Sequence, residues 1–397
     1  LGLCFKKEDH KEGYATYFRE YLRIYMTAGK PEKSNYRWNP EQYYQDSLAW
    51  ERNPLYGWCK KNLKLDGTQY DIYSDGLKIY TTLNSRMQRY AEEAVVEHLG
   101  NDLQPLFSRE KIEKQNPPFS NDLTAEEVRD ILDRSIKRTE RYRILKNAGV
   151  AFEEVRKIFN KPVEMQIFTW KGIRDTVMSP LDSIKHYKSF FRAGFMVMEP
   201  QTGNIRAYVG GPDYRYFMYD MVSVGKRQVG STIKPILYTL AMQEGLGPCD
   251  KVPNIPQTFI LPDGTPWTAR GGGKRPGEMV TLRWGLANSE NNISGWVLKQ
   301  FTPLAVAQMA HKMGIHSFID PVPSVFLGTA EISVKEMTAA YSIFANKGVY
   351  NTPMMVSRIE DKYGNVLAEF RPESREVITA QTAYLMLVSY THLRAHE

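Results

Sequence analysis

The sequence predicts an α+β fold in which helices pack on a mainly antiparallel sheet. Two β-rich runs within residues 194–211 flank the turn Glu-Pro-Gln-Thr-Gly-Asn, which is typical of a β-hairpin. A block of helical patterns follows, and a second hairpin pattern surrounds Asp-Lys-Tyr-Gly-Asn at residues 361–365. The order of strands, then helices, then strands is that of an α+β domain.

Before the first hairpin, residues 14–30 have the pattern of one amphipathic helix. The residues expected near one face of that helix are Tyr17, Tyr21, Ile24 and Tyr25. Residues 31–54 contain Pro, Asn and Trp with little periodicity, and we interpret them as a linker.

Residues 65–100 contain a turn, a strand and a helix. Gly76 lies in the turn, residues 77–81 alternate as a strand does, and Asn84 or Ser85 can cap a helix. Gly100 is expected to close that helix. The helix side expected to be apolar comprises Met87, Tyr90, Ala91, Ala94 and Val95.

Residues 101–188 are interpreted as an inserted subdomain of unknown role. Its first part, to about residue 160, is charged and helical in pattern. Two strand-like runs then flank a Lys171-Gly172 turn. The helical patterns after the first hairpin cover residues 234–245, 281–301, 303–314 and 333–348.

Composition excludes several classes of protein. The chain has 397 residues and is 42% hydrophobic, so it is too long for one ordinary domain and too apolar for disorder. Cys4, Cys59 and Cys249 are scattered, so neither a disulfide framework nor a metal cluster is indicated. The net charge of +7, from 52 basic and 45 acidic residues, favours a solvated mixed-charge surface over a nucleic-acid partner.

The candidate nucleophile is Ser231, in the stretch Arg-Gln-Val-Gly-Ser-Thr-Ile-Lys-Pro. Lys234 follows three residues later, nearly one helical turn, so its amine can reach the hydroxyl and act as a base. For that role the amine must be partly neutral near pH 7, which burial can arrange. Gly230 is expected to allow a close backbone approach just before the serine.

The Ser-x-x-Lys pattern alone is weak, because it also begins at Ser108 and at Ser223. Ser231 is distinguished by the hairpin before it and by Ser289-Glu290-Asn291 after it, inside a helix-break-helix passage. The Ser289 hydroxyl could relay a proton, and the Asn291 amide could hold an acyl side chain. By itself the triplet is more often a capped helix start.

These motifs and their flanks resemble the class A penicillin-binding proteins, which are bifunctional peptidoglycan synthases. The signature set of that superfamily is Ser-x-x-Lys, Ser-Asp-Asn and Lys-Thr-Gly. Ser231 with Lys234 matches the first motif, and Ser289 with Asn291 matches the second. The longer similar stretches are DGLKIYTTLNSRMQRYAEEAV, MEPQTGNIRAYVGG, KRQVGSTIKPILY and PSVFLGTAEISVKEMTAAYSIFANKG.

The resemblance implies the serine β-lactamase and penicillin-binding-protein transpeptidase fold, incomplete at the C-terminus and with an inserted small α+β subdomain. It also implies a domain layout. Residues 1–64 would be a remnant of the glycosyltransferase side and a linker, 65–100 would lead into the transpeptidase domain, 101–188 would be the insertion, and 189–387 would be the transpeptidase domain without its last strands. Residues 388–397, VSYTHLRAHE, break the pattern and are predicted to be a non-native tail.

The same resemblance implies a role for each site residue. Ser231 would attack the penultimate D-Ala carbonyl of a stem peptide, and Lys234 would take its proton. Ser289 would pass a proton to the departing D-Ala, and Asn291 would hold the amide of the donor peptide. An amine of a neighbouring stem peptide would then resolve the acyl-enzyme, and β-lactams would acylate Ser231 by the same route.

The implied partners are peptidoglycan stem peptides and lipid-linked precursor strands, with β-lactams as covalent inhibitors. No metal or organic cofactor is expected, because backbone N–H groups hold the oxyanion. The longer parent protein is expected to polymerise glycan as well. Its anchor would precede residue 1 and place the catalytic part on the periplasmic side of the inner membrane.

Two departures from the family pattern bear on activity. The middle position of the second motif is Glu290, at a site whose side chain need not point inward. Lys-Thr-Gly does not occur in the sequence, so the chain is expected to acylate poorly. Two alternatives remain open: a serine β-lactamase, and a non-catalytic β-lactam sensor or peptidoglycan-binding module.

Overall fold

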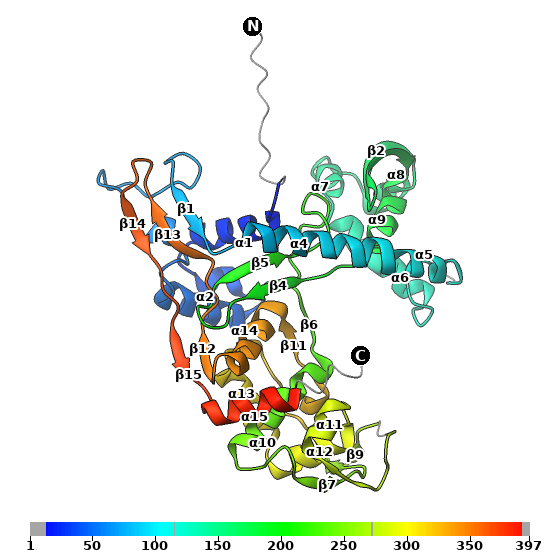
Figure 1. Ribbon diagram of the computed structural model, residues 1–397. Coiled ribbons are helices and arrows are strands. Elements are labelled where there is room, and N and C mark those ends of the chain that lie inside the picture. Colours follow the sequence, from blue (N-terminus) through cyan, green and yellow to red (C-terminus); the bar gives the residue numbers. More distant parts are fainter. Residues whose placement is uncertain (1–12, 115, 271–272, 391–397) are drawn as a thin grey trace. The chain divides into compact units, whose positions relative to one another are not determined.

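The computed structural model describes residues 13–390 except 115 and 271–272 (Figure 1). The chain divides into two compact units. One consists of Tyr90–Ala193, and the other combines Leu1–Arg89 with Gly194–Glu397. Both units contain helices and strands, so the predicted α+β class is confirmed.

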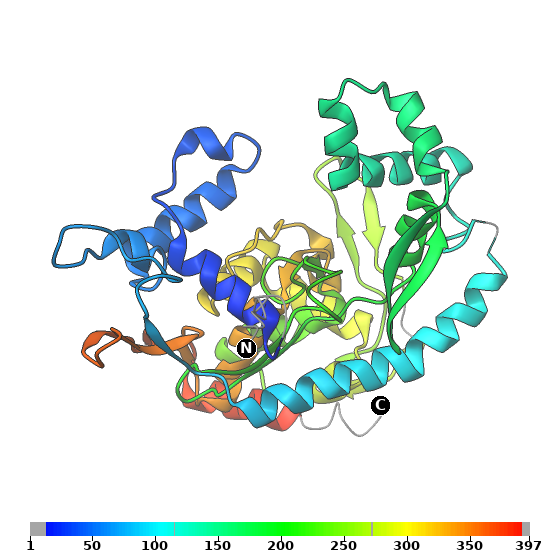
Figure 2. The same cartoon turned by 90° about the horizontal axis from the view of Figure 1, so that it is seen from above.

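The unit Tyr90–Ala193 is a group of short helices with one antiparallel hairpin (Figure 2). In that hairpin, β2 (Val163–Thr169) pairs with β3 (Gly172–Met178) around the predicted turn. Its helices are α5 (Gln104–Ile112), α6 (Ala125–Lys137), α7 (Glu140–Asn147), α8 (Phe152–Phe159) and α9 (Pro180–Lys188). Ile136, Val155 and Phe159 form its small core.

The expectation that Gly100 ends a helix is wrong. Helix α4 (Ser85–Val95) continues as a π-helical stretch, Val96–Leu103, and then as α5. Gly100 is buried, and a Cβ atom there would lie 2.9 Å from the ring of Trp170. The glycine therefore makes room for an indole ring and does not terminate the helix.

Helix α1 (Thr16–Thr27) confirms the first predicted helix, but its buried face differs from the expected one. Ile24 is 56% exposed. The buried side chains of this helix are Tyr17, Phe18, Glu20, Leu22 and Met26. The tyrosine-rich pattern placed the apolar face about one position away from the true one, because tyrosine fits both interior and surface positions.

The segment interpreted as a linker contains a helix. Residues Lys33–Tyr36 form a 3₁₀ turn, and α2 runs from Pro40 to Arg52. The Asn39 side chain accepts a hydrogen bond from the Gln42 N–H at 3.1 Å, and Pro40 occupies the first turn. Asn followed by Pro was the available start signal for this helix. A further short helix, α3, covers Trp58–Lys61.

The larger unit holds its strands in several small sheets, because most of its strands are three to five residues long. Each pairing of named strands is antiparallel, and an isolated parallel bridge joins Asn204 to Met354. The two predicted hairpins are β4 (Phe195–Met198) with β5 (Ile205–Val209), and β13 (Val356–Glu360) with β14 (Val366–Glu369). Strand β1 (Lys78–Thr81) joins β13. The other pairs are β6 (Lys226–Gln228) with β11 (Glu331–Ser333), β7 (Lys251–Pro253) with β10 (Met279–Thr281), β8 (Thr258–Ile260) with β9 (Pro266–Thr268), and β12 (Val349–Asn351) with β15 (Ser374–Glu376).

The predicted helical block forms the core of this unit. Its helices are α10 (Lys234–Gln243), α11 (Leu282–Ala287), α12 (Asn291–Gln300), α13 (Pro303–Lys312), α14 (Val334–Ala345) and α15 (Ala380–Tyr390), with a 3₁₀ turn at Pro323–Leu327. Helix α10 is buried along almost its whole length. Because helix α10 is so closely packed, it holds Lys234, its first residue, in a fixed position.

Helix α15 reaches Tyr390, three residues into the segment predicted to be a non-native tail, and the origin of that segment stays a prediction. Ser389 is buried, and its hydroxyl donates to the Leu385 carbonyl oxygen at 2.8 Å. The rest of the predicted tail lies outside the described residues.

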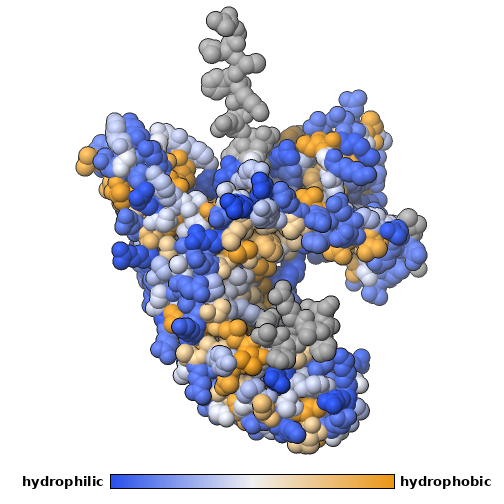
Figure 3. All heavy atoms as spheres, viewed as in Figure 1, coloured by the Kyte–Doolittle hydropathy of each residue, from blue (hydrophilic) through white to orange (hydrophobic). Residues whose placement is uncertain are grey.

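The face shown in Figure 3 mixes polar and apolar side chains. Within the described residues, no helix has the length and apolar character needed to cross a bilayer.

Candidate active site

Ser231 is positioned by a strand pair and a tight turn. Strand β6 ends at Gln228 and pairs with β11. The next two residues continue this contact, with the Val229 N–H donating to the Ala330 carbonyl at 3.1 Å and the Gly230 N–H to the Gly328 carbonyl at 3.0 Å. Ser231 lies in the 3₁₀ turn Gly230–Ile233, directly before α10, and its side chain is exposed.

The close backbone approach expected at Gly230 occurs at a different glycine. A Cβ atom on Gly230 would have nothing within 4 Å, and this residue instead supplies a positive φ of 54°. A Cβ on Gly328 would lie 1.9 Å from the Gly230 carbonyl oxygen. Gly328 therefore lets the second segment press against the turn that carries Ser231.

Lys234 is 1% exposed, and its ammonium group is held by three oxygen atoms. It donates to the Ser289 carbonyl oxygen at 2.5 Å, to Ser289 Oγ at 3.1 Å and to Asn291 Oδ1 at 2.8 Å. The structure thus brings together Lys234, Ser289 and Asn291, which the sequence placed in two motifs more than fifty residues apart.

Burial lowers the pKa of Lys234 to about 8, and the carboxylate of Glu290 opposes this shift. With a pKa of about 8, roughly a tenth of the amine is neutral at pH 7. The lysine is therefore able to accept a proton near neutral pH, as a general base requires.

Ser289 owes its position to the end of helix α11. The Glu290 N–H donates to the Gly285 carbonyl at 2.8 Å, and the Ser289 N–H donates to the Leu286 carbonyl at 3.0 Å. This is a Schellman motif, in which the residue after the cap is left-handed and is usually glycine. Ser289 takes that conformation with φ of 51°. A non-glycine residue held there costs conformational energy, which is common at functional sites.

Asn291 begins helix α12, and both ends of its amide are engaged. Its Oδ1 accepts from Lys234, and its Nδ2 donates to the Arg270 carbonyl oxygen at 2.9 Å. In this structure the Asn291 amide orients Lys234. To hold the amide of a peptide, Asn291 would have to give up its hydrogen bond with Lys234 or with the Arg270 carbonyl oxygen.

Lys234 donates no hydrogen bond to Ser231 within the described part of the chain. The predicted contact between base and nucleophile is thus not formed in this state. Contacts of this kind are often loose in enzymes without bound substrate and tighten when substrate binds. Within the same residues, no group of three or more His, Cys, Asp or Glu side chains could hold a metal ion.

The expectation that Glu290 need not point inward is wrong. Glu290 is 5% exposed, and its Oε1 has no hydrogen-bond partner in the described structure. Both residues that flank Glu290 contact Lys234, so the structure holds this segment against the buried lysine. Burial of this carboxylate near the lysine explains its effect on the lysine pKa.

Comparison with protein-family models gives two matches. A model of the penicillin-binding protein middle domain matches residues 114–191. A model of the penicillin binding protein transpeptidase domain matches residues 193–387, which contain Ser231, Lys234 and the 289–291 motif. Together the two matches cover more than half of the chain.

Curated relatives agree with the family models. The chain is 32% identical to penicillin-binding protein 2D of Bacillus subtilis over 199 residues, which is 50% of this chain and 29% of that protein. It is 24% identical to penicillin-binding protein 1A of Neisseria meningitidis over 352 residues, 80% of this chain and 43% of that protein. The chain thus spans less than half the length of these relatives.

Among solved structures, penicillin-binding protein 1A from Haemophilus influenzae has the same fold. The TM-score is 0.59 at 18% identity, over 96% of this chain and 58% of that one. The two family models together match most of the chain, and the chain therefore belongs to the penicillin-binding protein family, with matches to its middle domain and its transpeptidase domain.

Proposed function

We propose that this chain is a serine D,D-transpeptidase that crosslinks peptidoglycan stem peptides through an acyl-enzyme on Ser231. The observation that carries the proposal is the buried Lys234 amine, held 3.1 Å from Ser289 Oγ and three residues from the exposed Ser231. A lysine with a lowered pKa that contacts the Ser289 hydroxyl has the chemistry to take a proton from a serine and return it.

In the first step, Ser231 Oγ attacks the carbonyl carbon of the penultimate D-Ala while its proton passes to the neutral Lys234 amine. The developing oxyanion needs hydrogen-bond donors. The Ser231 N–H is one candidate, because it donates no backbone hydrogen bond within the described residues.

In the second step, the C–N bond to the last D-Ala breaks. The contact between Lys234 Nζ and Ser289 Oγ offers a path for the proton to the departing amine. An amine from a neighbouring stem peptide then attacks the Ser231 ester, gives up a proton along the reverse path and forms the crosslink. A β-lactam would open its ring on the same serine and remain attached.

We also propose the setting in which the longer protein acts. Its partners would be peptidoglycan stem peptides and lipid-linked precursor strands, and it would carry glycosyltransferase activity beside the transpeptidase. Because these substrates lie outside the cytoplasmic membrane, the site would face the periplasm, with the protein anchored in that membrane.

The 397 residues lack Lys-Thr-Gly, which in this superfamily supplies a cation and an oxyanion donor beside the serine. We propose that the chain is acylated slowly for this reason. Loss of a single oxyanion donor lowers rates by about 10² to 10³-fold. A reduction of that size would leave slow labelling that long incubation can detect.

The test is covalent labelling of the full chain with fluorescent penicillin, alongside penicillin-binding protein 2D of Bacillus subtilis. Slow labelling is expected, at least about 100-fold below that of the relative. It should vanish in Ser231→Ala and persist in Ser108→Ala, the matched control from another Ser-x-x-Lys. Labelling that survives in Ser231→Ala would exclude this nucleophile, and labelling as fast as in the relative would overturn the proposed impairment.

The two alternatives predict different fates for the acyl group. A β-lactamase would release penicilloate quickly, whereas a sensor and a transpeptidase would keep the label. Transfer of the acyl group from a thioester analogue of the stem-peptide terminus to an added D-amino acid separates these two. Ser231-dependent transfer supports the transpeptidase, and stable acylation without transfer supports the sensor.

A further inference from the structure

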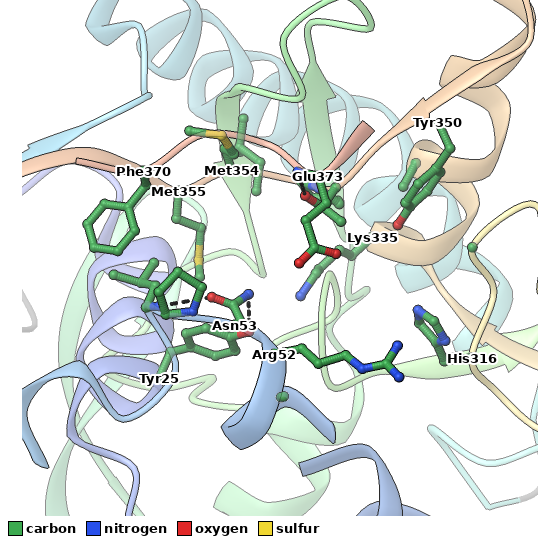
Figure 4. A pocket seen from close by; sticks show the side chains of 18 of the residues that line it. Tyr25, Arg52, Asn53, His316, Lys335, Tyr350, Met354, Met355, Phe370 and Glu373 are labelled. Atoms are coloured by element: carbon green, nitrogen blue, oxygen red, sulfur yellow. Dashed lines mark hydrogen bonds between the residues drawn. The ribbon is translucent and has the colours of Figure 1, made fainter. Parts of the chain in front are cut away.

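A cavity lies in the larger unit, and the proposed reaction does not use it. Its volume is about 430 Å³, and it is lined by parts of α1, α2, α14, β12 and the segments around residues 352–356 and 370–375 (Figure 4). None of Ser231, Lys234, Ser289 or Asn291 belongs to its lining. A cavity of this size can hold a small organic molecule.

The lining of the cavity carries a net positive charge, and Figure 4 shows Lys335 and Arg52 toward one end of it. Its cations are Arg52, Lys335, Arg371 and Arg375, and its carboxylates are Glu336 and Glu373, which leaves a formal charge of +2. The pKa of His316 is lowered, mainly by desolvation, so this lining residue is neutral at pH 7 and adds no charge.

Lys335 is the most informative of these cations. Its Nζ donates to the hydroxyl of Tyr21 at 2.8 Å, and the amine lies 5.0 Å from the centre of the Tyr21 ring and 6.0 Å from that of Tyr25. Within the described part of the chain it forms no ion pair with a carboxylate. A partly buried ammonium group that faces a cavity and has no anionic partner favours an anion in that cavity.

The two carboxylates do not supply that partner. The Glu336 carboxylate accepts five hydrogen bonds, from the N–H and hydroxyl groups of Ser333 and Ser317 and from the His316 N–H. Figure 4 shows the Glu373 carboxylate and the Lys335 amine both pointing into the cavity. The structure forms no ion pair between these two groups, nor does Arg52 pair with a described carboxylate.

The opposite end of the cavity is apolar. Met354, Met355 and Phe370 line it together with Tyr25, as Figure 4 shows. Asn53 closes this side by donating to the Tyr25 hydroxyl at 3.0 Å. Methionine side chains adapt to irregular apolar ligands, and an aromatic ring beside them adds a flat contact surface.

We propose that this cavity binds a small organic carboxylate, with the carboxylate between Lys335 and Arg52 and its aliphatic body against Met354, Met355 and Phe370. The cations match the charge of such a ligand, since arginine and lysine form short, strong hydrogen bonds to carboxylates. The apolar end matches the body. This binding site is independent of Ser231 chemistry, so its failure would leave the proposed function standing.

The probe is hexanoate, added to the full chain and followed by ligand-observed NMR. A molecule of this size is expected to bind with a dissociation constant on the order of 1 mM. Hexanamide, which has the same body without the charge, should bind at least about tenfold more weakly, because charge-assisted hydrogen bonds are about twice as strong as neutral ones. Inorganic phosphate, which has charge without the body, should also bind more weakly.

Lys335→Met should weaken hexanoate binding at least about tenfold, and Arg52→Gln should weaken it about threefold or more. The matched control is Lys362→Met, an exposed lysine of the β13–β14 turn that does not line the cavity. Arg52 is exposed on α2, so its variant keeps the test decisive if Lys335→Met does not fold. Equal binding of hexanoate and hexanamide, equal binding of hexanoate and phosphate, or unchanged binding in Arg52→Gln would overturn the proposal.

Discussion

Two lysines in the same unit, Lys234 and Lys335, have opposite electrostatic settings. Both lie at the first turn of a helix, and neither forms an ion pair within the described residues. The pKa of Lys234 is lowered to about 8, whereas the pKa of Lys335 is raised. The comparison shows that burial alone does not decide whether the pKa of a lysine is lowered or raised.

The difference comes from the partners of each amine. At Lys234, burial has the largest effect on the pKa, and the Glu290 carboxylate only partly offsets it. At Lys335, burial also lowers the pKa, but the tyrosines Tyr21 and Tyr25 outweigh it by accepting a hydrogen bond and facing the cation. One amine is therefore suited to proton transfer, and the other stays a cation.

The largest expected effect concerns the two lysines themselves. Lys234→Met should lower the rate of penicillin acylation by about 10³-fold, because it removes the base that we propose for Ser231. Lys335→Met should change that rate by less than about threefold, since it acts on no reacting atom. Both rates are measured by time-resolved labelling of the full chain. If both variants lost the same fraction of the acylation rate, the loss would reflect a general effect on folding stability and not a role of Lys234 as a base.

The next effect is a pH dependence that only one lysine should show. In the proposed mechanism the neutral Lys234 amine is the reactive form, so acylation should rise about tenfold from pH 7 to pH 9, as the pH passes the lysine pKa of about 8. Hexanoate binding should stay constant over this range, because the pKa of Lys335 is raised and its charge persists. A flat acylation profile would contradict the role given to Lys234.

A smaller effect is expected at Asn291. Asn291→Ala removes an oxygen that accepts from Lys234 at 2.8 Å, so the amine should be oriented less well and acylation should fall about tenfold at pH 7. Asn292→Ala, on the same helix, is not a suitable control because Asn292 is buried and donates to Asn254. Gln300→Ala, at the exposed end of α12, serves instead and should keep the full rate.

Glu290 should move the pH profile without abolishing acylation. Its carboxylate raises the pKa of Lys234, so Glu290→Gln should shift the midpoint of the acylation profile to lower pH. The direction follows because loss of a nearby negative charge disfavours the ammonium form. A shift to higher pH would show that another group sets the lysine pKa.

The smallest effect is on stability. Lys335→Met removes one hydrogen bond and the contacts with two tyrosine rings, so the free energy of unfolding should fall by about 1 kcal/mol at pH 7. Folding raises the pKa of Lys335. Its contribution to stability is therefore fully present at any pH below the pKa of the lysine in the unfolded chain, and it is lost as the pH rises through the higher pKa of the folded state. Urea unfolding at pH 7 measures it, and an unchanged midpoint would contradict the assigned contacts.

Much of the local structure could be predicted. The hairpins β4–β5 and β13–β14 occur where alternation and turn residues placed them, and the helical block follows the predicted order. Local rules failed where tertiary packing competes with them. Gly100 looked like a helix end but accommodates Trp170, and Ile24 looked buried but is exposed. Helix α2 was missed because aromatic residues obscured its periodicity.

The sequence by itself determined which chemical groups are present: a Ser-x-x-Lys pattern at a helix start and a Ser-x-Asn pattern at a helix break. Only the tertiary structure decided that Ser289 and Asn291 meet Lys234, and that Lys335 meets Tyr21, 314 residues away. The physical reason is that a pKa depends on burial and on neighbours in space. Periodicity reports only neighbours along the chain, so it could name the lysines but not tell the base from the permanent cation.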